Sequence, residues 1–231
     1  MIEMGDCLNC KSLDNRVSVF VLIEMSIFMS DIAKGTRHHE KCSWCLGDAE
    51  YEHYHDNEWG VPQKDDRVLF EKISLEGFQA GLSWITILRK RDNFRKAFDN
   101  FDLNIVSIYD EGNIEKILKN AGVVRHRGKI ESVINNSKRA KELQTEFGSL
   151  ATFFWSFEPK DNSKLSETRV RETSIPSFSK ESKAMSKALK QRGWTFVGPT
   201  ICYSFMQSMG LVNDHIDSCF RGEIVADFRQ K

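Results

Sequence analysis

The sequence predicts an all-α protein, and two observations lead to that class. From Lys41 onward, apolar residues recur at the three- and four-residue spacing of a buried helix face, in one segment after another. No stretch keeps the period-two alternation of a half-buried strand, and no hairpin dipeptide separates two apolar runs. With 231 residues, of which 40% are hydrophobic and 29% charged, the composition is typical of a soluble globular protein with a sizeable core.

Residues 1–40 differ from the rest of the chain, and we expect them to form an extension outside the fold. They hold four of the seven methionines and an apolar run, Val17 to Met29, with no capping pattern before it. That run is too short to span a membrane, is interrupted by Glu24, and lacks the basic start and cleavage site of a signal peptide. The expected domain is 41–222, followed by a tail, 223–231, because the helical pattern runs out near the end.

Polar caps and glycines divide the first half of the domain into helices. The expected helices run from Asp65 or Asp66 to Gly81, from Ser83 to Phe98, from Ile105 to Tyr109 after Asn104, and from Asn113 to Gly122.

The second half holds two helical blocks separated by a loop. A long amphipathic segment follows the basic run at 125–129, and a short aromatic segment, Leu150 to Phe157, comes after it. The non-periodic stretch from Asp161 to Ser182 is the expected loop. Helices are then expected from Ser182 to Arg192 and from Thr200 to Gly210.

Cysteine and histidine residues suggest a metal site, with two sets in competition. Two Cys and two His suit a closed tetrahedral structural zinc, and His-x3-Cys places one pair a helical turn apart. That set comprises Cys42, His55, His215 and Cys219, which would join the two ends of the domain. The rival set has two CxxC pairs with an unusually long spacer, Cys7, Cys10, Cys42 and Cys45. The simplest alternative is that these are ordinary buried thiols and surface imidazoles.

The chain has six cysteines, which are too few for a disulfide scaffold. This number fits a protein of a reducing compartment.

Two basic hairpins suggest a nucleic-acid face, although the net charge of zero gives no global sign of one. The segment from Ser182 to Gln207 has the pattern helix, Gly-containing hairpin, helix, which presents backbone N–H groups at a helix N-terminus. Lysines and Arg192 dominate its approach, and the segment from Lys119 to Lys129 is basic without an acid. The alternative is that both are solvated helix ends.

Glu76 is a lone carboxylate in an apolar stretch that is dense in aromatic residues, from Tyr51 to Trp84. Carboxylates are rarely buried unless they are paired or functional. Aromatic rings around a buried acid describe a pocket that stacks on a flat ligand, as an enzyme acting on a flipped base requires. The alternative is an amphipathic helix with Glu76 on its solvent-facing side.

Four motifs, YHDNEWGVP, LEGFQAGLSWITIL, RHRGKI and FVGPTICYSFMQ with GLVNDH after it, closely resemble the constitutive, type I family of 3-methyladenine DNA glycosylases. The resemblance is collinear from about Cys42 to Cys219. It implies a helix-hairpin-helix glycosylase fold and monofunctional hydrolysis of the N-glycosidic bond of 3-methyladenine in alkylated DNA, leaving an abasic site. It also implies one structural zinc per chain on Cys42, His55, His215 and Cys219.

The resemblance assigns the remaining site residues. Glu76 would bind the lesion base, Tyr54 and Trp84 would pack on it, and Trp44, Tyr51 and Trp59 would complete the pocket wall. The DNA contacts would come from Arg125, Arg127, Lys129, Lys190, Arg192, Gly193, Gly198 and Thr200.

One position departs from the wider superfamily, which often carries a catalytic aspartate after the hairpin. The matching position here is Asn213, with Asp214 next to it, and no lysine lies between Gln191 and Gln207 to act as a lyase nucleophile.

The resemblance implies that the binding partner is double-stranded alkylated DNA. It also implies a monomeric protein that needs no other protein partner and does not associate with a membrane. The implied location is the bacterial cytoplasm, at the nucleoid through DNA. A helix-hairpin-helix DNA-binding module without catalysis is the alternative, and a zinc-dependent hydrolase is disfavoured because four Cys/His ligands close the zinc.

Overall fold

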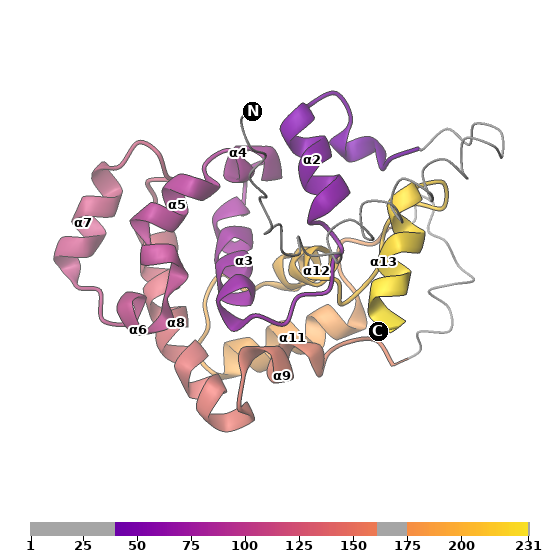
Figure 1. The fold of residues 1–231 in the computed structure, drawn as a ribbon. Coiled ribbons are helices and arrows are strands. Elements are labelled where there is room, and N and C mark those ends of the chain that lie inside the picture. Colours follow the sequence, from indigo (N-terminus) through magenta and orange to yellow (C-terminus); the bar gives the residue numbers. More distant parts are fainter. Residues whose placement is uncertain (1–39, 161–174, 231) are drawn as a thin grey trace, which may run out of the picture. The chain divides into compact units, whose positions relative to one another are not determined.

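The computed structural model describes residues 40–160 and 175–230, and these form helices throughout (Figure 1). The chain divides between His39 and Glu40 into two units, of which the second holds all the described residues. Within the described residues no strand forms, and a single isolated bridge joins Glu40 to Cys219. The first elements are η1 (Ser43–Cys45), α2 (Ala49–Asn57), α3 (Asp66–Gln79), α4 (Trp84–Leu88), α5 (Arg91–Ala97), η2 (Asp99–Phe101) and α6 (Leu103–Val106). They are followed by α7 (Glu111–Lys119), α8 (Arg127–Phe147), α9 (Leu150–Trp155), α11 (Lys180–Gln191), α12 (Pro199–Ser208) and α13 (Phe220–Gln230).

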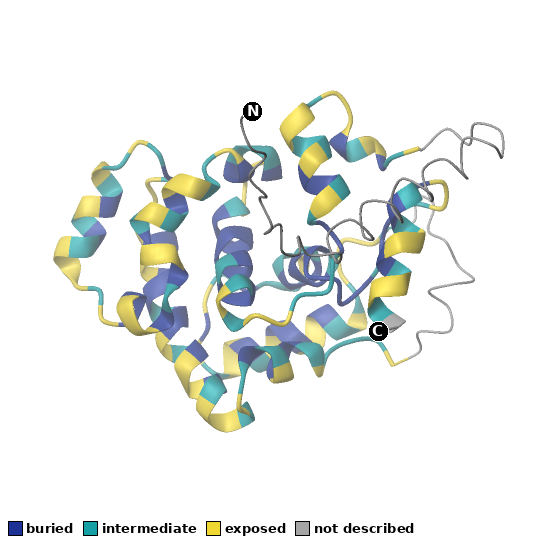
Figure 2. Ribbon diagram, viewed as in Figure 1, coloured by how far each residue is buried: buried dark blue, intermediate teal, exposed yellow. Residues whose placement is uncertain are grey.

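Helix α3 is the central element of this unit. The Asp65 carboxylate caps it by accepting hydrogen bonds from the backbone N–H groups of Arg67 and Val68, as the sequence predicts. Nearly every residue from Leu69 to Phe78 is buried, which Figure 2 shows as an almost continuous dark ribbon. A helix buried on all sides offers no solvent-facing side to a charged residue, so each charge on it needs a partner.

Phenylalanine side chains fill the core around α3. Their rings meet in edge-to-face, tilted and stacked contacts, such as the tilted pair Phe78 and Phe94 at 4.5 Å between centroids and the stacked pair Phe98 and Phe101 at 5.5 Å. The largest fully buried ones are Phe70, Phe78, Phe94, Phe98, Phe101, Phe154 and Phe205.

Some expected helix boundaries were wrong. The segment expected as one helix from Ser83 to Phe98 is two helices, α4 and α5, and Ser83 makes no side-chain cap. The cap of α7 is Asp110, with Asn113 completing a reciprocal capping box three residues later. Both residue types are favoured as N-caps. Asp110 is the N-cap because it lies just before the first turn of α7, whereas Asn113 lies within that turn.

Asp66, at the start of α3, makes hydrogen bonds to residues of α8 and α9 that lie 78 to 85 residues later in the chain. Its carboxylate accepts hydrogen bonds from the backbone N–H groups of Leu150 and Ala151, at the N-terminus of α9, and from the Gln144 amide on α8. An acid at a helix N-terminus satisfies free N–H groups and the helix dipole. Asp66 therefore fixes the turn from α8 to α9 against the start of α3.

The C-terminal residues are part of the fold, which corrects the expected tail 223–231. Helix α13 runs to Gln230, Val225 on it is fully buried, and Arg229 pairs with Glu158 at 2.5 Å. Arg229 also donates to the backbone carbonyl of Leu211. The apolar positions at the end of the chain are too few for a clear period, and tertiary contacts hold this helix instead.

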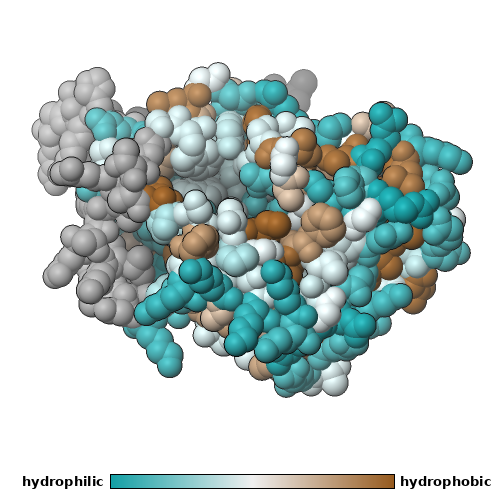
Figure 3. All heavy atoms as spheres, turned by 180° about the vertical axis from the view of Figure 1, so that it is seen from behind, coloured by the Kyte–Doolittle hydropathy of each residue, from teal (hydrophilic) through white to brown (hydrophobic). Residues whose placement is uncertain are grey.

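The expected extension and most of the expected loop lie outside the described residues. Among the described helices, none has the length and apolar character needed to cross a membrane. From behind, the surface is mixed, and hydrophilic side chains dominate its lower part, where α8, α9 and α11 lie (Figure 3).

Candidate active site

Glu76 lies inside the protein. It is 4% exposed, one turn before the end of α3, which excludes the interpretation that places it on a solvent-facing side. Burial raises the pKa of its carboxyl, and the nearby Lys72 ammonium opposes that rise. The location of Glu76 on a rigid buried helix gives its carboxylate a defined position.

The partner of Glu76 is Lys72, which the sequence analysis missed. Lys72 Nζ lies 2.9 Å from Glu76 Oε1 and donates to the Tyr54 hydroxyl at 2.8 Å. Lys72 is itself buried, and burial lowers the pKa of its ammonium to about 8. The i, i+4 spacing of a lysine and a glutamate in an apolar run was the available signal.

Two aromatic rings border this ion pair. Trp84, at the start of α4, and Tyr54, on α2, lie 5.4 Å apart between ring centroids. Lys72 Nζ lies over both rings, 3.2 Å from the Trp84 centroid and 5.1 Å from that of Tyr54. The predicted combination of Glu76, Tyr54 and Trp84 therefore occupies one place in the structure.

The other three predicted aromatic residues extend this cluster toward the Cys/His group. Trp44 lies edge-on to Tyr51, Tyr54 and Trp59, with centroids 4.9, 6.4 and 5.1 Å away. Trp59 packs on the imidazoles of His55 and His215. Trp59 therefore connects the aromatic cluster to the predicted metal ligands.

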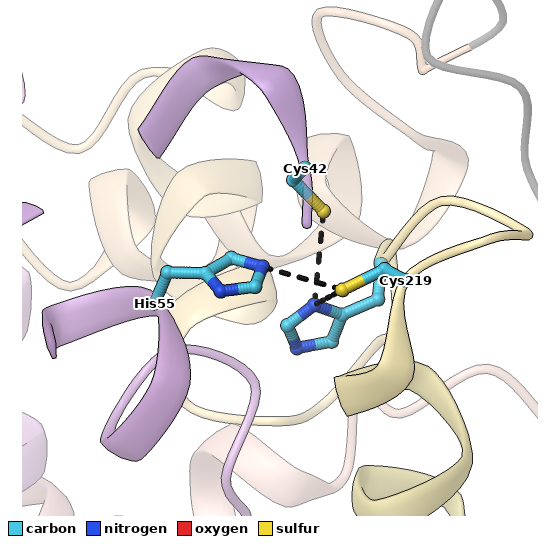
Figure 4. Close-up of side chains that lie close together, drawn as sticks. Cys42, His55 and Cys219 are labelled. Carbon is cyan, nitrogen blue, oxygen red and sulfur yellow. Dashed lines mark hydrogen bonds between the residues drawn. The ribbon is translucent and has the colours of Figure 1, made fainter. Parts of the chain in front are cut away.

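Cys42, His55, His215 and Cys219 converge in the structure, so the set that joins the two ends of the domain forms a possible metal site. All four are buried, and their ligand atoms lie within 4.8 Å of one another. Figure 4 shows that Cys42, His55 and Cys219 point toward one another from separate segments of the chain. Cys219 Sγ lies 3.4 Å from His55 Nε2 and 3.5 Å from His215 Nδ1.

Each imidazole has its second ring nitrogen engaged, as metal-binding histidines usually do. His55 Nδ1 lies 2.8 Å from the Asp56 carboxylate, and His215 Nε2 lies 3.2 Å from the carbonyl oxygen of Trp59. These contacts turn the other nitrogen of each ring toward the two thiols. The donor set and its orientation fit a tetrahedral ion.

The thiols of Cys42 and Cys219 lie close enough to shift each other's pKa in opposite directions. A hydrogen bond from Cys42 is the main cause that holds the pKa of Cys219 far below its usual range. The same contact raises the pKa of Cys42. A thiolate is the form that ligates a metal, and the lowered pKa of Cys219 favours that form.

Close backbone contacts position His215. Gly60 and Gly210 both have positive φ. A Cβ on Gly60 would lie 3.1 Å from His215 Nε2, and one on Gly210 would lie 2.6 Å from the Pro62 nitrogen. Only glycine permits this approach. The N–H of Phe220 donates to the carbonyl of Glu40, which joins the two ends of the unit beside Cys219.

In the rival CxxC set, Cys7 and Cys10 lie outside the described residues. Cys45 is buried and its thiol donates to the carbonyl oxygen of Cys42 at 3.1 Å. Cys45 therefore has a partner on the backbone, whereas Cys42 faces the two histidines.

The two basic hairpins lie side by side. The His126 ring, at the start of α8, lies edge-on to Phe196 in the loop between α11 and α12, with centroids 6.3 Å apart. Asn136 on α8 braces the second hairpin by exchanging two hydrogen bonds with the backbone of Thr195. Gly193 adopts a φ of +77°, and its carbonyl accepts from Asn135. One face of the protein thus carries both elements.

Most of the predicted DNA-contact residues on this face are exposed, and one of them is buried. Arg125, Lys190, Gly193 and Thr200 are exposed, and Gly198 caps α12. Lys129 is buried and donates to the carbonyls of Phe78 and Ala80, so its ammonium caps the end of α3 and is not available to a phosphate. A lysine in a basic run predicts a positive charge on the surface. Here the carbonyl groups at the end of a neighbouring helix bind the ammonium instead.

Arg127 and Arg192 form ion pairs within the protein. Arg127 pairs with Glu111 at 2.7 Å and with Glu115, and Arg192 pairs with Glu146 at 2.7 Å. Ion pairs as accessible to solvent as these are individually weak.

Asp214 is held away from solvent by Tyr203 and Gln207, which donate to it at 2.7 and 2.8 Å. The neighbouring Asn213 amide donates to the carbonyl of Gly222. Both side chains have structural partners in the C-terminal part of the domain.

Comparison with known proteins places this arrangement in a family. Residues 44–222 match the family model described as methyladenine glycosylase, which spans more than half of the 231 residues. The chain belongs to the methyladenine glycosylase family. The match contains all of the aromatic cluster and three of the four residues of the Cys/His group, and it starts two residues after Cys42.

Relatives in this family share nearly half of the aligned sequence. The DNA-3-methyladenine glycosylase 1 of Escherichia coli is 48% identical over 180 residues, covering 78% of this chain and 95% of that protein. The DNA-3-methyladenine glycosylase of Haemophilus influenzae is 44% identical over 180 residues, covering 78% and 96%.

Solved structures of family members have the same fold. A crystal structure of 3-methyladenine DNA glycosylase I superposes with a TM-score of 0.72 at 47% identity, covering 78% of this chain and 98% of that one. A structure of the Staphylococcus aureus enzyme, described as showing the basis of 3-methyladenine recognition, gives a TM-score of 0.71 at 29% identity, with 79% and 96% covered. The predominantly helical architecture predicted from the sequence is therefore that of this family.

Proposed function

We propose that this protein is a DNA-3-methyladenine glycosylase that acts in base-excision repair. It hydrolyses the N-glycosidic bond of 3-methyladenine in alkylated DNA, releases the base and leaves an abasic site. The observation that carries the proposal is the buried Glu76, paired with Lys72 beside the rings of Tyr54 and Trp84, in a chain of the methyladenine glycosylase family.

The chemistry of the substrate explains why so few groups are needed. Adenine methylated at N3 carries a positive charge in DNA, so its glycosidic bond is weak and the base leaves as a neutral molecule. No general acid is needed to protonate the leaving group. The enzyme gains most by binding the extruded cationic base and excluding normal bases, after which water attacks the sugar carbon.

Glu76 reads the edge of the base, and the two rings bind its face. A carboxylate that accepts from the base amine makes a charge-assisted hydrogen bond, of about 1.5–3 kcal/mol. Stacking of a cation on Trp84 and Tyr54 adds about 0.5–2 kcal/mol. Burial raises the pKa of Tyr54 well above its usual value, so its hydroxyl stays protonated. Trp44, Tyr51 and Trp59 shape the wall behind these groups.

The adjacent hairpins form the DNA grip, as a helix-hairpin-helix element. The exposed Arg125 and Lys190 contact phosphates, and the N–H groups near Thr200 at the start of α12 bind a phosphate as well. Arg127 and Arg192 exchange their carboxylate partners for phosphates. Lys129 is removed from this set because its ammonium caps α3.

The Cys/His group binds one structural zinc through Cys42, His55, His215 and Cys219. Four protein ligands close the coordination sphere, so this ion stabilises the fold and takes no part in hydrolysis. We further propose a monomer that binds double-stranded alkylated DNA in the bacterial cytoplasm, at the nucleoid.

Strand cleavage distinguishes hydrolysis from lyase chemistry. Duplex DNA treated with a methylating agent and incubated with the protein should break only after mild alkali, which cleaves abasic sites. Breaks without alkali would show a lyase activity and contradict the monofunctional mechanism. Intact strands after alkali, with the protein bound to the duplex, would favour the non-catalytic DNA-binding module.

A further inference from the structure

The ammonium of Lys72 contacts the same three side chains that are proposed to bind the methylated base. Its ammonium has three N–H bonds, and the structure provides three acceptors for them. These are Glu76 Oε1 at 2.9 Å, the Tyr54 hydroxyl at 2.8 Å and the face of the Trp84 ring, 3.2 Å from its centroid. The three groups are also the ones proposed to bind the cationic base.

We propose that Lys72 is a specificity-determining residue, a resident cation that occupies the base-reading position and competes with the methylated base for Glu76, Tyr54 and Trp84. This inference rests on the proposed function of those three residues. While the cluster holds no base, the lysine keeps the buried carboxylate charged and hydrogen-bonded. For a cationic base to take the same carboxylate oxygen, the ammonium must give up Glu76 Oε1.

Charge balance decides how this exchange occurs. With Lys72 protonated, the ion pair is neutral, and a methylated base would add an unbalanced positive charge to a buried site. With Lys72 neutral, the carboxylate and the base balance each other. The side chain is 7% exposed, so the ammonium is held away from bulk water and loss of its proton is the simpler route.

The other charges near Lys72 cancel one another. Glu58 at the end of α2 and Arg91 on α5 both act on Lys72, and they pair with each other at 2.8 Å. Tyr54 on α2 stays neutral because burial raises the pKa of its hydroxyl. Glu76 is therefore the charge that governs Lys72, and the pKa of the ammonium, about 8, falls in a range open to experiment.

The Trp84 indole supports a role for this cluster in binding a ligand. Its Nε1 is buried and, within the described part of the chain, has no hydrogen-bond partner. A donor in the wall of the cluster that lacks an acceptor is available to a ligand with one, such as a ring nitrogen of a base.

The test is the pH dependence of single-turnover base excision from methylated duplex DNA at subsaturating protein. As pH rises from 7 to 9, the neutral fraction of a group with a pKa near 8 increases roughly tenfold, and wild-type excision should rise with it. Lys72→Met keeps the length of the side chain without its charge. It should be up to about tenfold faster than wild type at pH 7 and show no rise to pH 9.

Two further variants keep the test decisive. Lys72→Gln retains an N–H donor for Glu76 without a charge. It replaces Lys72→Met in the test if Lys72→Met does not fold, and the same result is expected: faster excision at pH 7 and no rise to pH 9. Lys64→Met removes an exposed ammonium that lies 5.6 Å from the Trp155 centroid, outside the cluster, and it should keep the wild-type rise.

The outcomes separate this inference from the proposed function. A folded Lys72 variant with wild-type rate and pH profile, or one slower at every pH with the rise retained, would overturn the role of Lys72. If Glu76→Gln slows excision at the same time, the base-reading role of Glu76 stands. If Glu76→Gln excises like wild type, the base-reading role fails and the inference fails with it.

Discussion

Replacing Cys219 by serine should remove the zinc and much of the stability of the domain. The substitution takes one of four ligands from a buried set whose atoms lie within 4.8 Å of one another. Structural zinc provides about 10–16 kcal/mol in zinc-finger peptides, and we expect about 3–5 kcal/mol here, because this domain has a core of its own. For a chain of this size that lowers Tm by roughly 10 °C. Metal analysis and thermal unfolding of the purified protein measure both effects.

The matched control is Cys202→Ser. Cys202 is equally buried but lies on α12, where its thiol donates to the carbonyl of Val197. This variant should retain one zinc per chain. Excision by Cys219→Ser should fall only in proportion to the folded fraction. Full zinc content and wild-type stability in Cys219→Ser would rule out the assignment of this ligand.

Glu76→Gln should slow excision of 3-methyladenine by roughly 10–100-fold, which corresponds to about 1.5–3 kcal/mol of lost interaction. The amide keeps the shape of the side chain, loses the charge and can present a donor to the base amine. Single-turnover excision from methylated duplex DNA measures the effect.

Two controls locate the defect in base binding. Affinity for undamaged duplex should hardly change, because it comes from contacts to phosphates. Glu71→Gln makes the same change on the same helix, where the carboxylate pairs with Arg95 at 2.8 Å outside the aromatic cluster, and it should excise normally. Equal losses in excision and in undamaged-duplex binding would place Glu76 in general DNA binding.

The ion pair with Lys72 changes what this substitution does to folding. Neutralising a buried acid that has no partner would leave stability unharmed or improve it. The structure shows a partner at 2.9 Å, and removing one half of a buried pair leaves the other uncompensated. Lys72 can respond by losing its proton, since its pKa is already lowered. We therefore expect a modest loss of stability relative to wild type at pH 7, which diminishes as pH rises to about 8 and stays constant above it, where Lys72 is neutral in both proteins.

Local signals predicted the helices well wherever a single residue could play only one role. Asp65 precedes the apolar face of α3 and caps it, and Gly81, with a φ of +80°, follows the last turn as expected. Where two polar residues competed for one role, as Asp110 and Asn113 did at α7, the sequence did not separate them. The break between α4 and α5 was likewise invisible, because both helices carry one continuous apolar pattern.

The site shows the same division. Cys42 and Cys219 were predicted in one set with His55 and His215, because two Cys and two His suit zinc and because of a family resemblance. The fold brings this set together from positions far apart in the chain. The partner of Glu76 was missed because Lys72 in an amphipathic pattern is usually solvated, and only the packing of α2 and α4 on α3 encloses it. Lys129 was misassigned for a similar reason, since the end of α3 reaches it across the fold.

The central claim is that this protein releases 3-methyladenine from alkylated DNA through the cluster around Glu76. Chromatography of the bases freed from methylated duplex DNA tests it directly. We predict that the wild-type protein releases 3-methyladenine in a time-dependent manner above the no-protein control, and that Glu76→Gln at the same folded concentration releases it roughly 10–100-fold more slowly. DNA binding by the wild-type protein without release of 3-methyladenine, or equal release by both proteins, would contradict the account.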